Sequence, residues 1–116
     1  MRLNESKLQA QCVKAFRLKY PDYHHLFFAV PNGGSRNPIE GARLKAEGVV
    51  AGVADMLLLV PNAQYHGLCI EFKWGKGRQQ ESQKKFQTEV EKIGYKYIIV
   101  RSFDDFCREI DIFLKN

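Results

Sequence analysis

The chain has 116 residues, which fits one compact domain and leaves no room for a second, so we expect a single domain over residues 1–116. Hydrophobic residues make up 45% of the chain and aromatic residues 12%, which excludes a disordered protein. Eighteen Lys and Arg against thirteen Asp and Glu residues give a net charge of +5, a balance compatible with a polyanionic partner.

Other classes of protein are disfavoured by local patterns. No apolar run approaches the roughly 18 residues that span a bilayer. Met1–Lys7 leads into an amphipathic stretch and does not resemble a signal peptide, so we expect a cytoplasmic protein. The cysteines lack disulfide or zinc-site spacing, and we expect free thiols at Cys12, Cys69 and Cys107. The histidines complete no metal-binding set: His24, His25 and His66.

The first half of the chain predicts a helix, a strand and a second helix. Apolar residues at four-residue spacing indicate a helix from about Glu5 to Lys19, with Asn4 as its N-cap and Pro21 ending it. A strand is expected at His25–Val30, and residues 31–38 (PNGGSRNP) form a loop of turn-forming residues. Ile39–Glu47 suits a short helix, with Gly48 in the position after its C-cap.

The second half predicts a hairpin followed by a helix, a strand and a last helix. Ala54–Val60 and Gly67–Lys73 are strands joined by a turn-rich segment, which favours antiparallel pairing. A helix is expected over Gln80–Ile93, with Phe86, Val90 and Ile93 inward, then a strand over Tyr95–Arg101. Ser102 caps the last helix, whose inward residues are Phe106, Ile110 and either Phe113 or Leu114. The order α-β-α-β-β-α-β-α predicts an α/β fold.

The predicted strand Gly67–Lys73 has two different faces. Side chains alternate along a strand, so Leu68, Ile70 and Phe72 share one face, which belongs against a helix. Glu71 and Lys73 share the other face with Cys69, an unusual choice for a strand inside a core.

The hairpin brings a second acid to the same face. If Val60 roughly faces Gly67, Asp55 falls opposite Glu71 or Lys73, and directly paired residues point to the same side of the sheet. Two clustered carboxylates repel each other unless a cation lies between them, and an oxygen-rich site suits Mg²⁺. Such an ion can polarise a phosphodiester and activate water, while Lys73 orients the water or offsets developing charge.

The alternative is a structural salt bridge between Glu71 and Lys73 on an exposed strand. The E-x-K tripeptide alone favours that alternative, because it is common. The apolar runs LLLV at residues 57–60 and LCI at residues 68–70 place the hairpin in the core and favour the metal site, because an unpaired buried charge is costly.

Two further residues are candidates for this site. Glu5 lies three residues before Leu8, hence on the inward face of the first helix, where it is either a third metal ligand or a favourable acid in the first turn. Gln83 lies three residues before Phe86, where its amide can hold water or a phosphate oxygen, or be a solvated surface side chain.

Five segments in order resemble the VRR-Nuc family of virus-type replication–repair nucleases, within the PD-(D/E)xK superfamily. They are VPNGGSR (30–36), KAEGVVAGVAD (45–55), IEFK (70–73), KGRQQESQ (76–83) and GY (94–95), and they run through almost the whole chain. The E-x-K motif is weak by itself, whereas this ordered set is specific.

The resemblance implies a restriction-endonuclease-like PD-(D/E)xK core, a mixed central sheet flanked by helices, and cleavage of DNA with Mg²⁺ or Mn²⁺. Asp55, Glu71 and Lys73 match the motif, Glu5 matches the acid of the first helix and Gln83 the glutamine after the E-x-K strand. Members of this length resemble phage or bacterial proteins, and some assemble as homodimers similar to Holliday-junction resolvases.

The sequence departs from the family pattern at two places. Ala54 stands where the family usually has proline before the aspartate; proline would stiffen the strand entry without supplying a ligand. Gln79 and Gln80 stand where a Ser-type cap often opens the next helix, which leaves its first turn less well defined.

Basic and glycine-rich segments flank the expected metal site. Two groups of cations would rim it, Arg36, Arg43 and Lys45 around the loop, and Lys76 and Arg78 after the E-x-K strand. Backbone N–H groups of a glycine-rich loop can meet phosphate oxygens, which makes Asn32, Gly33 and Gly34 candidates for contacts with DNA. The alternatives are a plain tight turn and a solvated basic surface.

These observations leave three functional hypotheses. The first is a homodimeric endonuclease specific for branched DNA, because paired cuts on a symmetric junction need two sites related by a two-fold axis. The second is a non-catalytic nucleic-acid-binding module, and the third is a sequence-specific, restriction-like nuclease. The clustered acids disfavour the second, and the lack of an added recognition domain disfavours the third.

Overall fold

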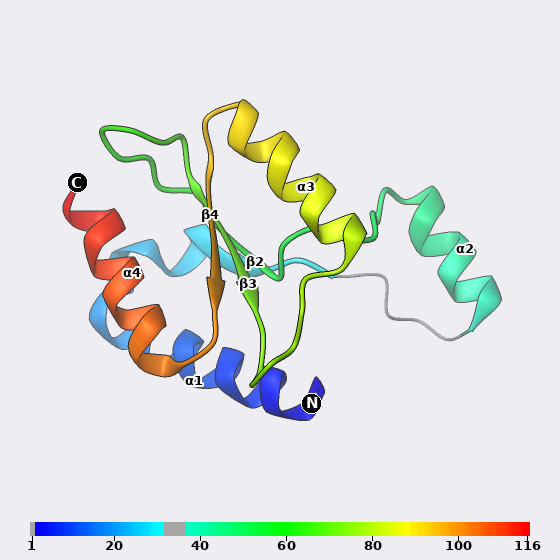
Figure 1. The fold of residues 1–116 in the computed structure, drawn as a ribbon, viewed down its shortest axis with the longest axis horizontal. Helices are drawn as coiled ribbons and strands as arrows, with labels where there is room; N and C mark the ends of the chain where they lie inside the picture. The colour runs from blue at the N-terminus through cyan, green and yellow to red at the C-terminus, as the bar shows by residue number, and fades with distance from the viewer. Residues whose placement is uncertain (1, 32–36) are drawn as a thin grey trace.

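The computed structural model describes residues 2–31 and 37–116. Its elements follow the predicted order, with one additional 3₁₀ helix, η1 (Figure 1). They are α1 (Arg2–Lys19), η1 (Pro21–Leu26), β1 (Phe27–Ala29), α2 (Pro38–Ala46), β2 (Met56–Leu58), β3 (Leu68–Phe72), α3 (Glu81–Lys92), β4 (Lys96–Val100) and α4 (Phe103–Lys115).

The start of α1 and the start of β1 differ from the sequence prediction. The helix begins at Arg2, so Asn4 lies inside it and the predicted N-cap is wrong. No residue of the first turn breaks a helix, which allows the helix to extend toward the N-terminus. His25 and Leu26 belong to η1 and not to a strand, because Pro21 has the fixed φ that suits the first position of a helical turn.

The four strands form one mixed sheet in the order β1-β2-β3-β4. β2 and β3 form the predicted antiparallel hairpin, with Met56 opposite Ile70 and Leu58 opposite Leu68. β1 adds to the other edge of β2, also antiparallel. β3 and β4 are parallel, because α3 carries the chain back to the same end of the sheet before β4 begins.

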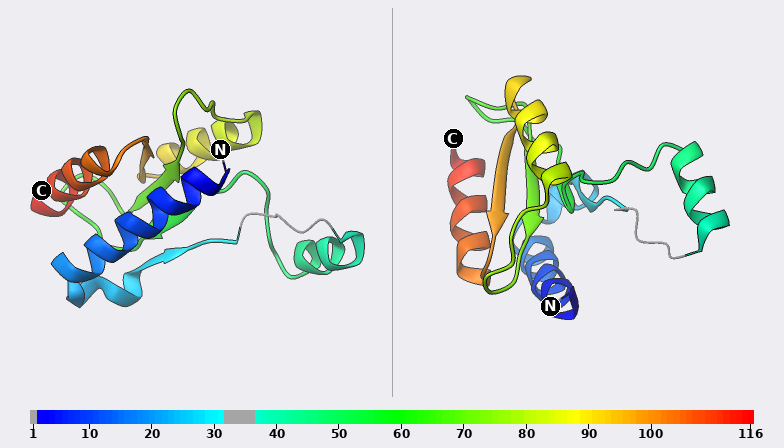
Figure 2. Two further views of the ribbon diagram at one scale, coloured as in Figure 1. Left: turned by 90° about the horizontal axis from the view of Figure 1, so that it is seen from below. Right: turned by 45° about the vertical axis from the view of Figure 1, so that its right-hand side comes forward.

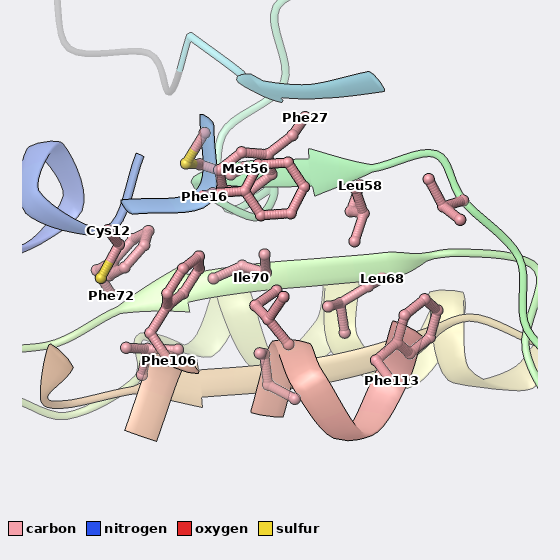
Figure 3. Packing of buried hydrophobic residues seen from close by; sticks show 14 of the residues in the cluster. Cys12, Phe16, Phe27, Met56, Leu58, Leu68, Ile70, Phe72, Phe106 and Phe113 are labelled. Carbon is pink, nitrogen blue, oxygen red and sulfur yellow. The ribbon is translucent and has the colours of Figure 1, made fainter. Parts of the chain in front are cut away.

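Helices cover both faces of this sheet (Figures 1 and 2). α1 and α4 pack on one face, where Leu68, Ile70 and Phe72 of β3 point, as the alternation predicts. The resulting core is rich in aromatic side chains (Figure 3), among them Phe16, Phe27, Phe72, Phe106 and Phe113. α3 packs on the other face against Cys69 and Tyr97.

The inward faces of α3 and α4 are largely as predicted. Phe86 and Val90 of α3 pack against the sheet as predicted. Ile93 is 63% exposed, so its predicted inward position is wrong. Ile93 is the C-cap of α3, where the chain already turns away from the helix. In α4, Phe113 is the buried residue of the pair left open by the sequence, and Leu114 is half-buried.

α2 stands apart from the sheet (Figures 1 and 2) and buries none of its side chains. Asn37 caps it by accepting the N–H of Ile39 at 2.9 Å, and Pro38 occupies its first turn. Gly48, with φ of +103°, follows the C-cap as predicted. Within the described ranges, none of the helices is both long and apolar enough to cross a membrane.

Candidate active site

Asp55 directly precedes β2, the strand that lies between β1 and β3 in the sheet. The register of β2 and β3 places it level with Glu71, one residue before β2 begins. Its backbone O accepts the N–H of Val30 at 2.9 Å, which extends the pairing of β1 and β2. Its carboxylate Oδ2 accepts the N–H of Phe72 at 2.7 Å. This bond across the hairpin ties the first candidate acid to the strand that carries the second.

Glu71 is fully buried, and its two carboxylate oxygens have different surroundings. Oε1 accepts hydrogen bonds from Nε2 of Gln79, at 3.1 Å, and from the hydroxyl of Tyr97. Oε2 lies 3.6 Å from Nζ of Lys73 and accepts no hydrogen bond from the described residues. Two donors therefore hold Oε1, whereas Oε2 carries negative charge in a buried position without a hydrogen-bond donor among the described residues.

Lys73 is 7% exposed and is held from both sides. Its Nζ donates to Oε1 of Gln83 at 3.1 Å and faces Oε2 of Glu71. The same Gln83 oxygen accepts the backbone N–H of Gln80 at 2.7 Å, at the N-cap of α3. The side-chain carbonyl oxygen of Gln83 therefore holds Lys73 against the start of α3. Only the NH₂ group of the Gln83 amide is left for other contacts.

Tyr97 and Gln79 are site residues that the sequence analysis missed. Burial, and then the hydrogen bond to Glu71, raise the pKa of Tyr97 well above its ordinary value, so the hydroxyl stays protonated and donates. Gln79 uses the same NH₂ group to donate to Oε1 of Gln87 at 2.8 Å. The signal in the sequence was a phenol in an otherwise aliphatic strand, YIIV at residues 97–100.

Asp55 and Lys73 open onto a cleft of about 1030 Å³. Glu5 and Gln83 line the same cleft, so four of the five predicted catalytic side chains border one space. Glu71 does not line it, because its side chain is fully buried.

Gly52 lines the cleft where the chain passes close to Ser82 in the first turn of α3. It has φ of +86°, and a Cβ at this position would lie 2.6 Å from Cβ of Ser82. Both the backbone conformation and the close approach therefore require glycine. This explains the second glycine of the KAEGVVAGVAD segment, which lets the chain pass the first turn of α3 immediately before Asp55.

Glu5 borders the cleft from the first turns of α1 and is half-buried. Among the described residues, no group of three or more His, Cys, Asp or Glu side chains is arranged to hold a metal ion. Glu5 is thus near Asp55 without completing a three-carboxylate cluster, and its part in metal binding stays a prediction.

The four predicted DNA-binding residues that the structure describes do not line the cleft. Arg43 lies on α2 and pairs with Glu47 at 3.2 Å, and Lys45 borders a smaller hollow of about 400 Å³ beside α2. Lys76 and Arg78 are exposed on the loop after β3, which Arg101 braces by donating to the carbonyls of Gly75 and Gly77. The remaining four lie outside the described residues: Asn32, Gly33, Gly34 and Arg36.

Comparison with known proteins shows a similarity in structure but none in sequence. No protein-family model matches the chain, and no curated protein matches it in sequence. A solved structure described as a "VRR_NUC domain protein" is similar to it, with a TM-score of 0.82 and 23% identity, covering 96% of this chain and 88% of that one. The chain has the fold of a VRR_NUC domain. The predicted α/β fold with a mixed, helix-flanked sheet is confirmed, and the match supports the resemblance to the VRR-Nuc family.

Proposed function

We propose that this VRR_NUC-fold protein is a divalent-metal-dependent endonuclease that hydrolyses DNA phosphodiesters. The observation that carries the proposal is the state of Glu71, which is fully buried, with Oε2 lacking a hydrogen bond among the described residues and lying 3.6 Å from Nζ of Lys73. A buried carboxylate left in this state costs stability unless a cation completes its surroundings.

The residues fit a hard divalent cation. Asp55, which lines the cleft, and Glu71, which is buried level with it on β3, supply carboxylate oxygens, the donor type that Mg²⁺ and Mn²⁺ prefer. Glu5, from α1, is the candidate third ligand. When bound, the ion would polarise the phosphoryl group and make a water molecule more acidic.

The side chains of the protein supply positioning and charge. Lys73 presents a cation where negative charge grows on the phosphoryl oxygens, and Gln83 fixes its direction by accepting from Nζ. Tyr97 and Gln79 hold Oε1 of Glu71, which leaves Oε2 directed toward Lys73. Catalysis by such a site depends on preorganisation, because groups already in place need not reorient during the reaction.

We further propose that the substrate is branched DNA such as a Holliday junction, cut by a homodimer. The domain carries one candidate site, and symmetric cuts on a junction need two sites related by a two-fold axis. Contacts to phosphates carry little sequence information, so a protein that binds chiefly through them distinguishes DNA by shape.

Cleavage assays test the proposal directly. The purified protein would be incubated with four-way junctions, flaps and linear duplex in Mg²⁺, Mn²⁺ or EDTA. Lys73→Ala is the test variant, and Lys85→Ala, at an exposed position of α3 away from the cleft, is the matched control. We expect metal-dependent cleavage that Lys73→Ala abolishes and Lys85→Ala retains. The absence of cleavage on every substrate would overturn the nuclease proposal.

The pattern of products and a binding measurement separate the finer alternatives. Paired nicks confined to junctions support the resolvase-like reading, whereas a fixed cut sequence in linear duplex supports a restriction-like enzyme. Gel filtration tests the dimer, and a monomer would contradict it. Mg²⁺ at about 100 times its dissociation constant should stabilise the fold by about 2.7 kcal/mol, and Glu71→Gln should reduce this shift in thermal unfolding.

A further inference from the structure

The cleft extends well beyond the candidate catalytic residues, along one face of α1. The α1 residues that line it occur in neighbouring pairs repeated every four residues: Glu5 and Ser6, Gln9 and Ala10, Val13 and Lys14, Arg17 and Leu18. Residues four apart lie above one another on a helix, so this set forms one continuous stripe along more than three turns. We call these residues the α1 face.

The α1 face leads away from the catalytic end of the sheet. Asp55 bonds to Val30, just after the end of β1, whereas η1 joins the end of α1 to the start of β1. The N-terminal part of α1 therefore lies toward the catalytic end and its C-terminal part toward the opposite end, as Figure 1 shows.

The chemistry of the α1 face changes along this direction. Glu5 is its single acid, at the end near Asp55. Ser6 and Gln9 follow as neutral side chains able to donate hydrogen bonds to phosphate, and Lys14 and Arg17 follow as exposed cations.

The two cations have no acidic partner within residues 2–31 and 37–116. The side-chain ion pairs of this part of the chain involve other basic residues, such as Lys19, which lies 2.7 Å from Asp111. Lys14 and Arg17 thus face the cleft with their charge uncompensated, which suits a polyanionic chain lying in it.

We propose that the α1 face binds the phosphate backbone of the DNA strand that leads to the candidate catalytic residues, with Lys14 and Arg17 contacting phosphates. This inference rests on the proposed nuclease function, and it assigns the DNA a path that the predicted basic residues did not include. A rise of about 1.5 Å per helical residue places Lys14 and Arg17 about 14 and 18 Å along α1 from Glu5. At about 3.4 Å per nucleotide of a strand, these contacts fall roughly four to five nucleotides from the cut.

Binding measured without cleavage tests the inference. A fluorescently labelled junction would be titrated with protein in EDTA at several salt concentrations. The variants are Lys14→Gln, Arg17→Gln and the double variant, and the control is Lys7→Gln, an exposed lysine of the same helix that does not line the cleft. All three positions are exposed, and circular dichroism would verify that each variant is folded.

We expect each single variant to lower the steepness of the plot of log binding constant against log salt concentration by about one, and the double variant to lower it by about two. The double variant should also bind about ten-fold more weakly near 0.1 M salt. Lys7→Gln should bind as the wild-type protein does. Shortening the DNA arm to about three nucleotides beyond the cut should remove the difference between wild-type and double variant, because the contacted phosphates are gone.

The outcomes separate this inference from the proposed function. If the wild-type protein cleaves DNA and the double variant binds with an unchanged salt slope, the proposed binding of DNA by the α1 face is refuted and the nuclease proposal stands. If the slopes change as expected while no substrate is cleaved, the nuclease proposal fails and the DNA path is retained. An equal loss in Lys7→Gln would also refute the inference, since the effect would then be one of general charge.

Discussion

Replacing Tyr97 by phenylalanine removes one of the two hydrogen bonds that hold Oε1 of Glu71. The carboxylate is fully buried, so no water compensates for the lost donor. Hydrogen bonds to charged groups contribute about 1.5–3 kcal/mol, and we expect Tyr97→Phe to lower the free energy of unfolding by about that amount. For a domain of this size the corresponding fall in Tm is on the order of 5–15 °C.

The matched control is Tyr95→Phe. Tyr95 is half-buried against His66, and its hydroxyl has no hydrogen bond within the described residues, so this variant loses the same atom without the same interaction. Urea unfolding of the three proteins measures the free energies. The Mg²⁺ concentration that gives half-maximal cleavage should rise in Tyr97→Phe alone, because Glu71 is then less firmly oriented. A Tyr97→Phe protein within about 0.5 kcal/mol of wild-type would refute the reasoning.

Three further predictions concern other parts of the structure. Gly48→Ala should cost roughly 1–2 kcal/mol of left-handed strain, and Gly52→Ala should destabilise by well over that, because of these two positions Gly52 alone also lacks space for a Cβ. Equal unfolding free energies of the two variants would contradict this. The hydrogen bonds from Lys19 and Tyr20 hold the pKa of Asp111 below its ordinary value of 3.8, so its contribution is present above that pH and is lost as pH falls through the lower value of the folded state. Asp111→Asn should therefore flatten the dependence of unfolding free energy on pH below about pH 4. Burial raises the pKa of Cys12 to about 12, that of Cys69 to about 11, and that of Cys107 as well. Cys107 is the least buried of the three thiols, so a thiol reagent at neutral pH should modify it first, and Cys107→Ser should remove that fast phase.

The hairpin was predictable because its information is local. Two apolar runs joined by a short turn-rich segment limit the register to about one residue, and the observed pairing of Met56 with Ile70 lies within that limit. The alternation of side chains along β3 then assigned Ile70 and Glu71 to opposite faces of the sheet. Sequence spacing alone was therefore enough to predict that Asp55 and Glu71 lie close together.

The partners of Glu71 were not predictable in the same way. Tyr97 reaches Glu71 because β4 pairs in parallel with β3 after the α3 crossover, and no local pattern sets that register. Gln79 comes from the loop between β3 and α3, whose path depends on Arg101 of a later segment. The α1 face was also missed, since only the packing of Leu8 and Phe16 decides which side of the helix borders the cleft.

The detachment of α2 has a consequence for measured stability. A helix of nine residues that fully buries no side chain receives little support from packing on the described residues, and isolated helices of that length are marginal in water. Its amide hydrogens should therefore exchange with solvent through local opening, at rates set by helix–coil equilibrium and not by global unfolding. The cooperative transition in denaturant then reports on the sheet and its three packed helices, and substitutions on the surface of α2 leave its midpoint unchanged.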